Sequence, residues 1–189
     1  MKYILYLLIT VSLLGCGGRE IKVPKPRGYF RIDLPKKVYK QFNQDCPFTF
    51  EYPDYARVEK DTDKNTQAYW YNIEFPKMKA TLHLSYIKID NNLLKILEDC
   101  RTLVYKHTVK ADAIADSMFI DKSKRLYGLT YDLKGEAASC YQFILTDSLK
   151  SVVRGALYFN VPPNKDSLAP VMIFIKKDIY HFIKTFAWK

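Results

Sequence analysis

Residues 29–89 alternate between apolar and polar side chains in short runs, several of which end at a proline. In the clearest run, 80–89, Ala80, Leu82 and Leu84 fall on one face. Alternation with a period of two is typical of a β-strand that buries one face. The short strands predicted by this pattern are 29–32, 48–52, 55–58, 69–75 and 80–89.

A longer period begins after the polar triplet Asp90-Asn91-Asn92, whose side chains suit the N-cap of a helix. From Leu93 to Ala111, apolar residues recur every three or four positions, as on the buried face of an amphipathic helix. The pattern predicts a helix over about 91–110, with His107 on its apolar stripe.

Three further strand-like runs follow, at 126–133, 139–145 and 152–160. Only Lys134-Gly135-Glu136 separates the first two, and Asp147-Ser148-Leu149 separates the second from the third. Strands that are joined by turns this short pair in the antiparallel direction.

The last apolar stripe predicts a helix that begins at an Asp166 or Ser167 cap, with Pro170 in its first turn. The order is therefore strands, helix, antiparallel strands and helix, which predicts an α+β fold over a single domain, 28–189. An antiparallel sheet sandwiched by helices would bury both helical stripes. This arrangement is similar to the PsbP/Mog1-like fold, an analogy that rests on element order and implies no function.

The N-terminus carries an export signal rather than a membrane span. Lys2 precedes an apolar run, 3–14, that is interrupted only by Thr10 and Ser12. This run is too short for a helix that crosses a bilayer, which needs about 20 residues. A basic residue, a short apolar run and small residues at its end are typical of a secretory signal.

The end of this signal, Leu13-Leu14-Gly15-Cys16, resembles a bacterial lipobox. The resemblance implies that diacylglycerol is attached to the Cys16 thiol and that cleavage separates Gly15 from Cys16. The predicted parts are a lipoprotein signal peptide (1–15) and a lipidated tether (16–27). The alternatives are an ordinary signal peptide with a chance cysteine, or a buried N-terminal strand.

The net charge of +10 is compatible with several classes of binding partner, and the export signal reduces their number. Nucleic acid is excluded for an exported protein, so the lysines suit anionic lipid headgroups, an acidic envelope protein or plain solvent exposure. We expect a membrane-anchored lipoprotein whose domain faces the periplasm, with inner and outer membrane both open. Whether Cys46, Cys100 and Cys140 form a disulfide in this oxidising compartment is also left open.

Candidate catalytic groups are sparse. His83, His107 and His181 are far apart in sequence and form no metal-binding motif. The close carboxylate pairs, Asp61 with Asp63 and Asp112 with Asp116, lie in polar segments that solvent can reach. We predict no catalytic residue, no cofactor and no metal, and therefore no enzyme.

Seven segments together resemble the gliding motility lipoprotein GldD family. They are PRGYFRIDLP (26–35), CPFTFEYPDYA (46–56), WYNIEFPKMKATLHLSY (70–86), HTVKADAI (107–114), QFILTDS (142–148), RGALYFNVPPNKDSLAP (154–170) and TFAW (185–188).

The resemblance implies a non-enzymatic cell-envelope lipoprotein required for gliding, whose machinery is coupled to the type IX secretion system. It implies envelope proteins of that machinery as partners, and it transfers a chemical role only to Cys16. One alternative is a lipoprotein that binds a small or lipid-like ligand inside the sandwich, which requires an apolar pocket. An envelope hydrolase is a third hypothesis, and it requires a nucleophile, a base and an orienting group close together.

Overall fold

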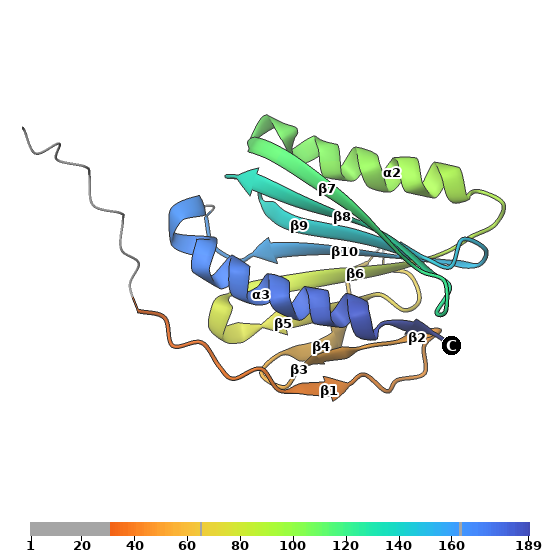
Figure 1. Cartoon of the computed structure of the whole chain (residues 1–189), viewed down its shortest axis with the longest axis horizontal. Helices are drawn as coiled ribbons and strands as arrows, with labels where there is room; N and C mark the ends of the chain where they lie inside the picture. The colour runs from red at the N-terminus through yellow and green to blue at the C-terminus, as the bar shows by residue number, and fades with distance from the viewer. Residues whose placement is uncertain (1–30, 65, 163) are drawn as a thin grey trace, which may run out of the picture. The chain divides into compact units, whose positions relative to one another are not determined.

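The strands predicted in the second half of the chain pair as their short turns require (Figure 1). The computed structural model describes residues 31–189 except Asn65 and Pro163, and Asp33–Lys189 forms one compact unit. The elements are β1 (Tyr39–Gln41), β2 (Phe48–Thr49), β3 (Glu51–Pro53), β4 (Arg57–Lys60), β5 (Tyr71–Phe75), η1 (Pro76–Met78), β6 (Ala80–Lys88), α2 (Leu93–Tyr105), η2 (Lys106–Val109), β7 (Ala111–Asp121), β8 (Leu126–Gly135), β9 (Ser139–Thr146), β10 (Ser151–Phe159), α3 (Lys165–Thr185) and β11 (Ala187–Trp188).

One seven-stranded sheet dominates the fold, with the strand order β4-β5-β6-β10-β9-β8-β7. Every neighbouring pair in it is antiparallel. Two small two-stranded sheets, β1-β3 and β11-β2, complete the described strands. The predicted strand at 29–32 is wrong where it can be tested, because Arg31 and Ile32 are not in a strand.

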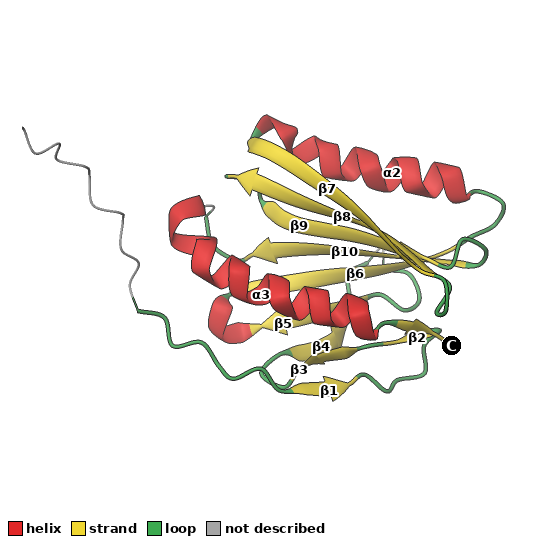
Figure 2. Cartoon of the chain, in the orientation of Figure 1, coloured by secondary structure: helices red, strands yellow, loops and turns green. Residues whose placement is uncertain are grey.

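The two helices cover opposite faces of the large sheet, as Figure 2 shows. Successive residues of β9 separate the faces, because Phe143 and Leu145 pack in the cluster under α3 while Ile144 packs in the cluster under α2. Neighbouring Val152 and Val153 divide in the same way. The prediction of an α+β fold, with an antiparallel sheet sandwiched by helices, is therefore confirmed.

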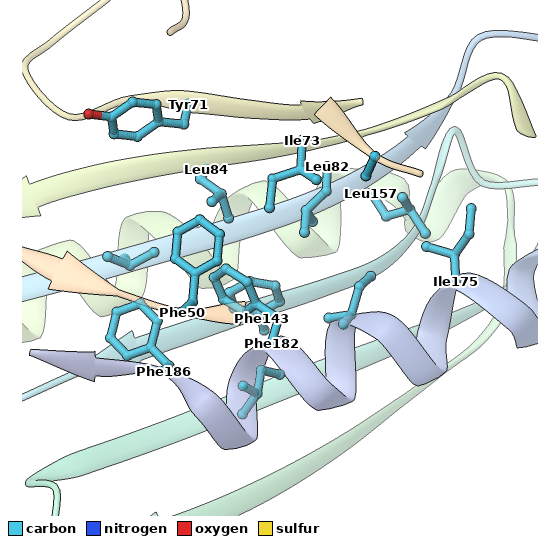
Figure 3. Packing of buried hydrophobic residues seen from close by; sticks show 14 of the residues in the cluster. Phe50, Tyr71, Ile73, Leu82, Leu84, Phe143, Leu157, Ile175, Phe182 and Phe186 are labelled. Carbon is cyan, nitrogen blue, oxygen red and sulfur yellow. The ribbon is translucent and has the colours of Figure 1, made fainter. Parts of the chain in front are cut away.

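The larger core lies between the sheet and α3, where aromatic rings from distant segments meet (Figure 3). Phe182 on α3 lies 4.4 Å from Phe50 and 5.5 Å from Phe143 between ring centroids. Phe50 and Phe143 are both fully buried. Burial of each such side chain contributes about 1.5–3 kcal/mol to stability, so this cluster holds α3 on the sheet.

The first helix is shorter than its apolar periodicity predicts. The α-helix α2 ends at Tyr105, and η2 continues the chain as a single 3-10 turn. His107 lies in η2, so its placement on the stripe of the α-helix is wrong. The Asn92 side chain makes no capping bond and instead accepts from the amide of Asp90.

The last helix begins earlier than expected. The side chain of Asn164 accepts a hydrogen bond from the Ser167 amide at 3.1 Å, so Asn164 is the N-cap rather than Asp166 or Ser167. Pro170 consequently lies inside the helix, beyond its first turn. It has no amide hydrogen to donate to the carbonyl of Asp166, and the ring removes one bond of the helical ladder.

Residues 111–121 form the strand β7, which the sequence pattern does not predict. The segment is rich in alanine and aspartate, which are poor strand formers, and it shows no regular alternation. It becomes a strand because β8 pairs with it along its whole length. Tertiary pairing thus overrides a weak local preference.

Candidate functional site

The predicted lipidation site cannot be placed in the fold. Gly15 and Cys16 lie outside the described residues, as do the signal peptide (1–15) and the tether (16–27). In the part of the chain that is described, no helix combines the length and the apolar character that a membrane span needs. The structure does describe where the chain enters the domain soon after the tether.

At this entry, a buried carboxylate on α3 holds the N-terminal segment. Asp178 is 2% exposed, and its Oδ1 lies 2.5 Å from Lys37 Nζ. Tyr39 Oη donates to the same oxygen at 2.9 Å, and Tyr55 Oη donates to Oδ2 at 2.5 Å. We call these four residues, Lys37, Tyr39, Tyr55 and Asp178, the Asp178 clasp.

Contacts around the clasp extend the same attachment along α3. Lys37 Nζ also donates to the carbonyl of Phe174 at 3.1 Å and lies 3.6 Å from the centroid of that ring. The Tyr39 ring stacks on His181 at 3.6 Å, and His181 Nε2 lies 2.6 Å from Glu51 Oε2. One face of α3 is therefore joined to β1, β3 and the segment before β1.

The electrostatics of the clasp favour a structural role. Burial raises the pKa of Tyr39 and of Tyr55, and the hydrogen bonds to Asp178 raise both further. The two phenols therefore stay protonated and act as donors, and the ammonium group of Lys37 supplies the compensating charge. A carboxylate with three donors is well satisfied in a low-dielectric site.

Sequence reasoning missed this site, although a signal for it exists. Asp178 lies three residues after Ile175 and four before Phe182, and both of these are buried. A lone acidic residue at such a position on an apolar stripe predicts a buried carboxylate that needs partners.

The histidines are only partly brought together. His83 on β6 and His107 in η2 both lie against the ring of Tyr158, at centroid distances of 5.6 and 6.2 Å. His83 Nδ1 bonds to Asn72 Oδ1 at 2.7 Å. His181 belongs to the surroundings of the Asp178 clasp instead.

Burial lowers the pKa of His83 and of His107, and the nearby guanidinium of Arg154 lowers both further, while Asp61 and Asp63 partly oppose the shift of His83. Arg154 itself donates from Nη2 to Gln142 Oε1 at 2.5 Å. The neutral imidazoles and the arginine form a polar strip on the sheet face that carries α2.

The two carboxylate pairs that the sequence suggested lie in different parts of the chain. Asp61 accepts from the amide of Asp63 at 3.0 Å, which is a turn within one segment. Asp112 and Asp116 lie on β7. Within residues 31–189 as described, no group of three or more histidine, cysteine or acidic side chains has a metal-binding arrangement.

Cys46, Cys100 and Cys140 are buried free thiols, which resolves the open question of a disulfide for the described cysteines. Burial raises the pKa of all three, that of Cys140 to about 12. A thiol of this kind is protonated at neutral pH and packs as a small apolar side chain.

Among the hollows on the described part of the domain, two lie beside α3 and away from the clasp. A cavity of about 360 Å³ lies where β10 meets the start of α3, and its lining includes Cys140, Tyr158, Phe159 and Met172. A groove of about 450 Å³ runs between β7 and α3. Its lining includes Met118, Phe119, Leu126, Tyr141, Tyr180 and Ile183.

Comparison with known proteins gives likenesses to solved structures and one family. The solution structure of cyanobacterial PsbP (CyanoP) from Synechocystis sp. PCC 6803 is similar with a TM-score of 0.48 and 9% identity, over 85% of this chain and 98% of that one. No curated protein matches the chain. The family model for the gliding motility lipoprotein GldD matches residues 19–188. The chain therefore belongs to the GldD family of gliding motility lipoproteins.

Proposed function

We propose that this chain is a non-enzymatic lipoprotein of the cell envelope, anchored through Cys16, that serves as a subunit or assembly factor of the gliding and type IX secretion machinery. Family membership over residues 19–188 is the observation that carries the proposal. The lipobox at Leu13-Leu14-Gly15-Cys16 supplies the anchor. The domain faces the periplasm, and its partners are envelope proteins of that machinery.

The Asp178 clasp supports a tethered role. Any pull on the lipidated N-terminus reaches the domain through the segment that contains Lys37 and Tyr39. Asp178 attaches this segment to the middle of α3, and α3 is fixed to the sheet by the aromatic core around Phe182. The Asp178 clasp thus holds the segment that contains Lys37 and Tyr39 on the core.

Crosslinking in intact gliding cells, with mass-spectrometric identification of neighbours, tests the proposal. The native chain should be recovered with components of the gliding or secretion machinery. A Cys16→Ser variant expressed at the same level is the matched control, because it retains the domain and lacks the anchor. If both chains recover the same abundant envelope proteins and nothing else, the proposed role in the machinery is wrong.

A second candidate function is the binding of a lipid-like ligand, and the cavity at the start of α3 favours it. The cavity volume of about 360 Å³ lies within the range of small-molecule sites, and apolar side chains such as Phe159 and Met172 line it. An Ala138→Phe variant should fill this space and abolish binding of a fluorescent fatty acid. Binding of the same probe by native and variant chains alike would remove this candidate.

A further inference from the structure

The outer side of β7 is an unpaired sheet edge. β7 pairs with β8 on its inner side, and no other strand of the described chain pairs with it. From Ile114 to Asp121 its register with β8 is continuous, and the only irregularity lies between Ala111 and Ala113. A regular edge of this length offers a row of backbone donors and acceptors to another strand.

This edge is only partly protected against pairing. Natural edge strands are commonly short, bulged or charged, above all with lysine, or carry proline. β7 carries Asp112, Asp116 and Asp121 and an irregularity between Ala111 and Ala113, but it is eleven residues long and contains no lysine, arginine or proline. Instead it presents Met118, which is 74% exposed, and Ile120, which is 53% exposed. On the other face of the sheet, Phe119 of the same strand lines the groove between β7 and α3, together with Tyr180. Apolar exposure next to an unpaired edge indicates an interaction surface.

The charges at the two ends of β7 are complementary to each other. Asp112 and Asp116 lie in its first half, whereas Asp121 at its end is followed by a turn with the three basic residues Lys122, Lys124 and Arg125. In an antiparallel pair, the β7 strands of the two copies run in opposite directions. The basic turn of each copy therefore lies beside the acidic half of the other. A surface that complements itself in this way fits a two-fold dimer.

The same charges select a register. If the two-fold axis passed through Asp116, two carboxylates would lie directly opposite each other, which is destabilising. An axis through Met118 places the two methionines opposite each other and Ile120 opposite Asp116 of the second copy. It also brings Lys122, the first residue after the strand, to Ile114 and diagonally next to Asp116 of the second copy, and it keeps the inward and outward faces of both strands matched.

We propose that β7 is a self-association edge, at which a second copy of this chain adds its own β7 in antiparallel register about Met118 and joins two sheets into one. Lipid anchoring would confine both copies to one membrane surface, which raises their effective concentration and favours an interface of modest size. This inference concerns the partner of the edge and does not depend on the proposed role in gliding.

Cysteine crosslinking of the full-length chain in membranes of its own bacterium tests the pairing. In an antiparallel pair, opposite Cα atoms are about 4.5–5.5 Å apart, which a disulfide can span. Met118→Cys should therefore give a covalent dimer of twice the chain mass under mild oxidation. The described native cysteines Cys46, Cys100 and Cys140 are buried and Cys16 is the proposed lipidation site, so the unmodified chain is the blank.

The register has its own test. Asp116→Cys and Ile120→Cys on separately tagged chains should crosslink to each other at least five-fold more than either does with itself. Adding Met118→Lys to both chains places two like charges on the axis and should reduce this product at least five-fold. Unchanged thermal melting of the Met118→Lys chain shows that the loss is not unfolding, because residue 118 is exposed.

Glu59→Cys on β4, at the other edge of the sheet, is the matched control for random collision. It should give no dimer under the same conditions. The proposal is overturned by a monomer-only result at Met118→Cys, by equal dimer from Glu59→Cys, or by a product whose mass shows a different protein on the edge.

Discussion

The two outer strands of the large sheet differ in how they meet solvent. β4 is four residues long and carries the charged side chains Arg57, Glu59 and Lys60. β7 is eleven residues long, regular over most of its length, and exposes Met118 and Ile120. The first edge is protected by its shortness and by charges that include lysine, whereas the second edge is long and, although it carries three aspartates, has no lysine or proline.

The two edges also differ in their position relative to the segment that contains Lys37 and Tyr39. Tyr55, just before β4, belongs to the Asp178 clasp, so this side of the domain holds the segment that follows the predicted tether. The β7 edge makes no contact of this kind in the described structure. The β4 side therefore attaches a segment of its own chain. We infer that the β7 edge is available for association with a second copy.

The largest expected effect comes from breaking the core on which the attached side depends. Phe182→Asp places an unpaired charge among the rings of Phe50 and Phe143, and we expect a loss of more than about 4 kcal/mol in the free energy of unfolding. Ile173→Asp on the same helix is the control, because Ile173 is 57% exposed and should change stability by less than about 0.5 kcal/mol. Urea titration followed by circular dichroism compares them, and equal midpoints would contradict the assigned core.

A smaller effect should follow from removing the clasp. Asp178→Asn leaves the ammonium group of Lys37 without its buried counter-ion, and we expect a loss of about 3 kcal/mol. Asp132→Asn breaks the pair with Lys176, in which the N–O distance is 2.7 Å and the carboxylate side chain is 34% exposed rather than 1%, and it should cost less than about 1 kcal/mol.

The same clasp variant has a spectroscopic readout. Because Asp178 helps to raise the pKa of Tyr39 and Tyr55, an ultraviolet titration of Asp178→Asn should show two tyrosines ionising at lower pH than in the native chain. An unchanged tyrosine titration would show that the clasp does not exist in solution.

Substitutions of two glycines compare the packing of the core with that of the β7 edge. A Cβ on Gly155 would collide with the buried ring of Phe143, and a Cβ on Gly128 would collide with the ring of Phe119 near the β7 edge. Gly155→Ala should cost about 1–3 kcal/mol, because the ring of Phe143 is enclosed by the core. Gly128→Ala should cost less, since Phe119 can turn toward the groove. Thermal denaturation ranks the two, and a larger loss from Gly128→Ala would contradict the openness of that edge.

The smallest effect is a pH dependence from the polar strip. Burial lowers the pKa of His83 and His107, so the folded chain binds fewer protons than the unfolded chain below the ordinary histidine value of 6.5. Stability should therefore fall as the pH falls below about 6.5 and should not change with these groups above it. The double variant His83→Gln/His107→Gln should flatten this part of the curve, and an unchanged slope would contradict the assignment.

Regular local patterns predicted much of the fold. The alternation at 80–89 gave β6 nearly to its ends, and the short turns at 134–136 and 147–149 gave the antiparallel order of β8, β9 and β10. The strand β7 could not be predicted, because its alanines and aspartates disfavour a strand and its pairing with β8 is a long-range effect.

The candidate site was harder to predict than the fold. Asp178 is visible in the sequence as an acidic residue on an apolar stripe, but its partners Lys37, Tyr39 and Tyr55 are more than a hundred residues away. Their meeting depends on where α3 lies on the sheet, which no local pattern contains. The lipobox, by contrast, is a contiguous motif of four residues, and lipidation at Cys16 stays a prediction outside the described residues.

The most direct measurement of the central claim is metabolic labelling with an alkyne fatty acid in cells whose chromosomal gene encodes Cys16→Ser. The native chain should take up the label, sediment with membranes and support spreading of the colony on agar. The variant should retain a folded domain, take up no label and fail to spread. If the variant stays membrane-bound and its colonies spread like the native strain, the account of a Cys16-anchored lipoprotein is contradicted.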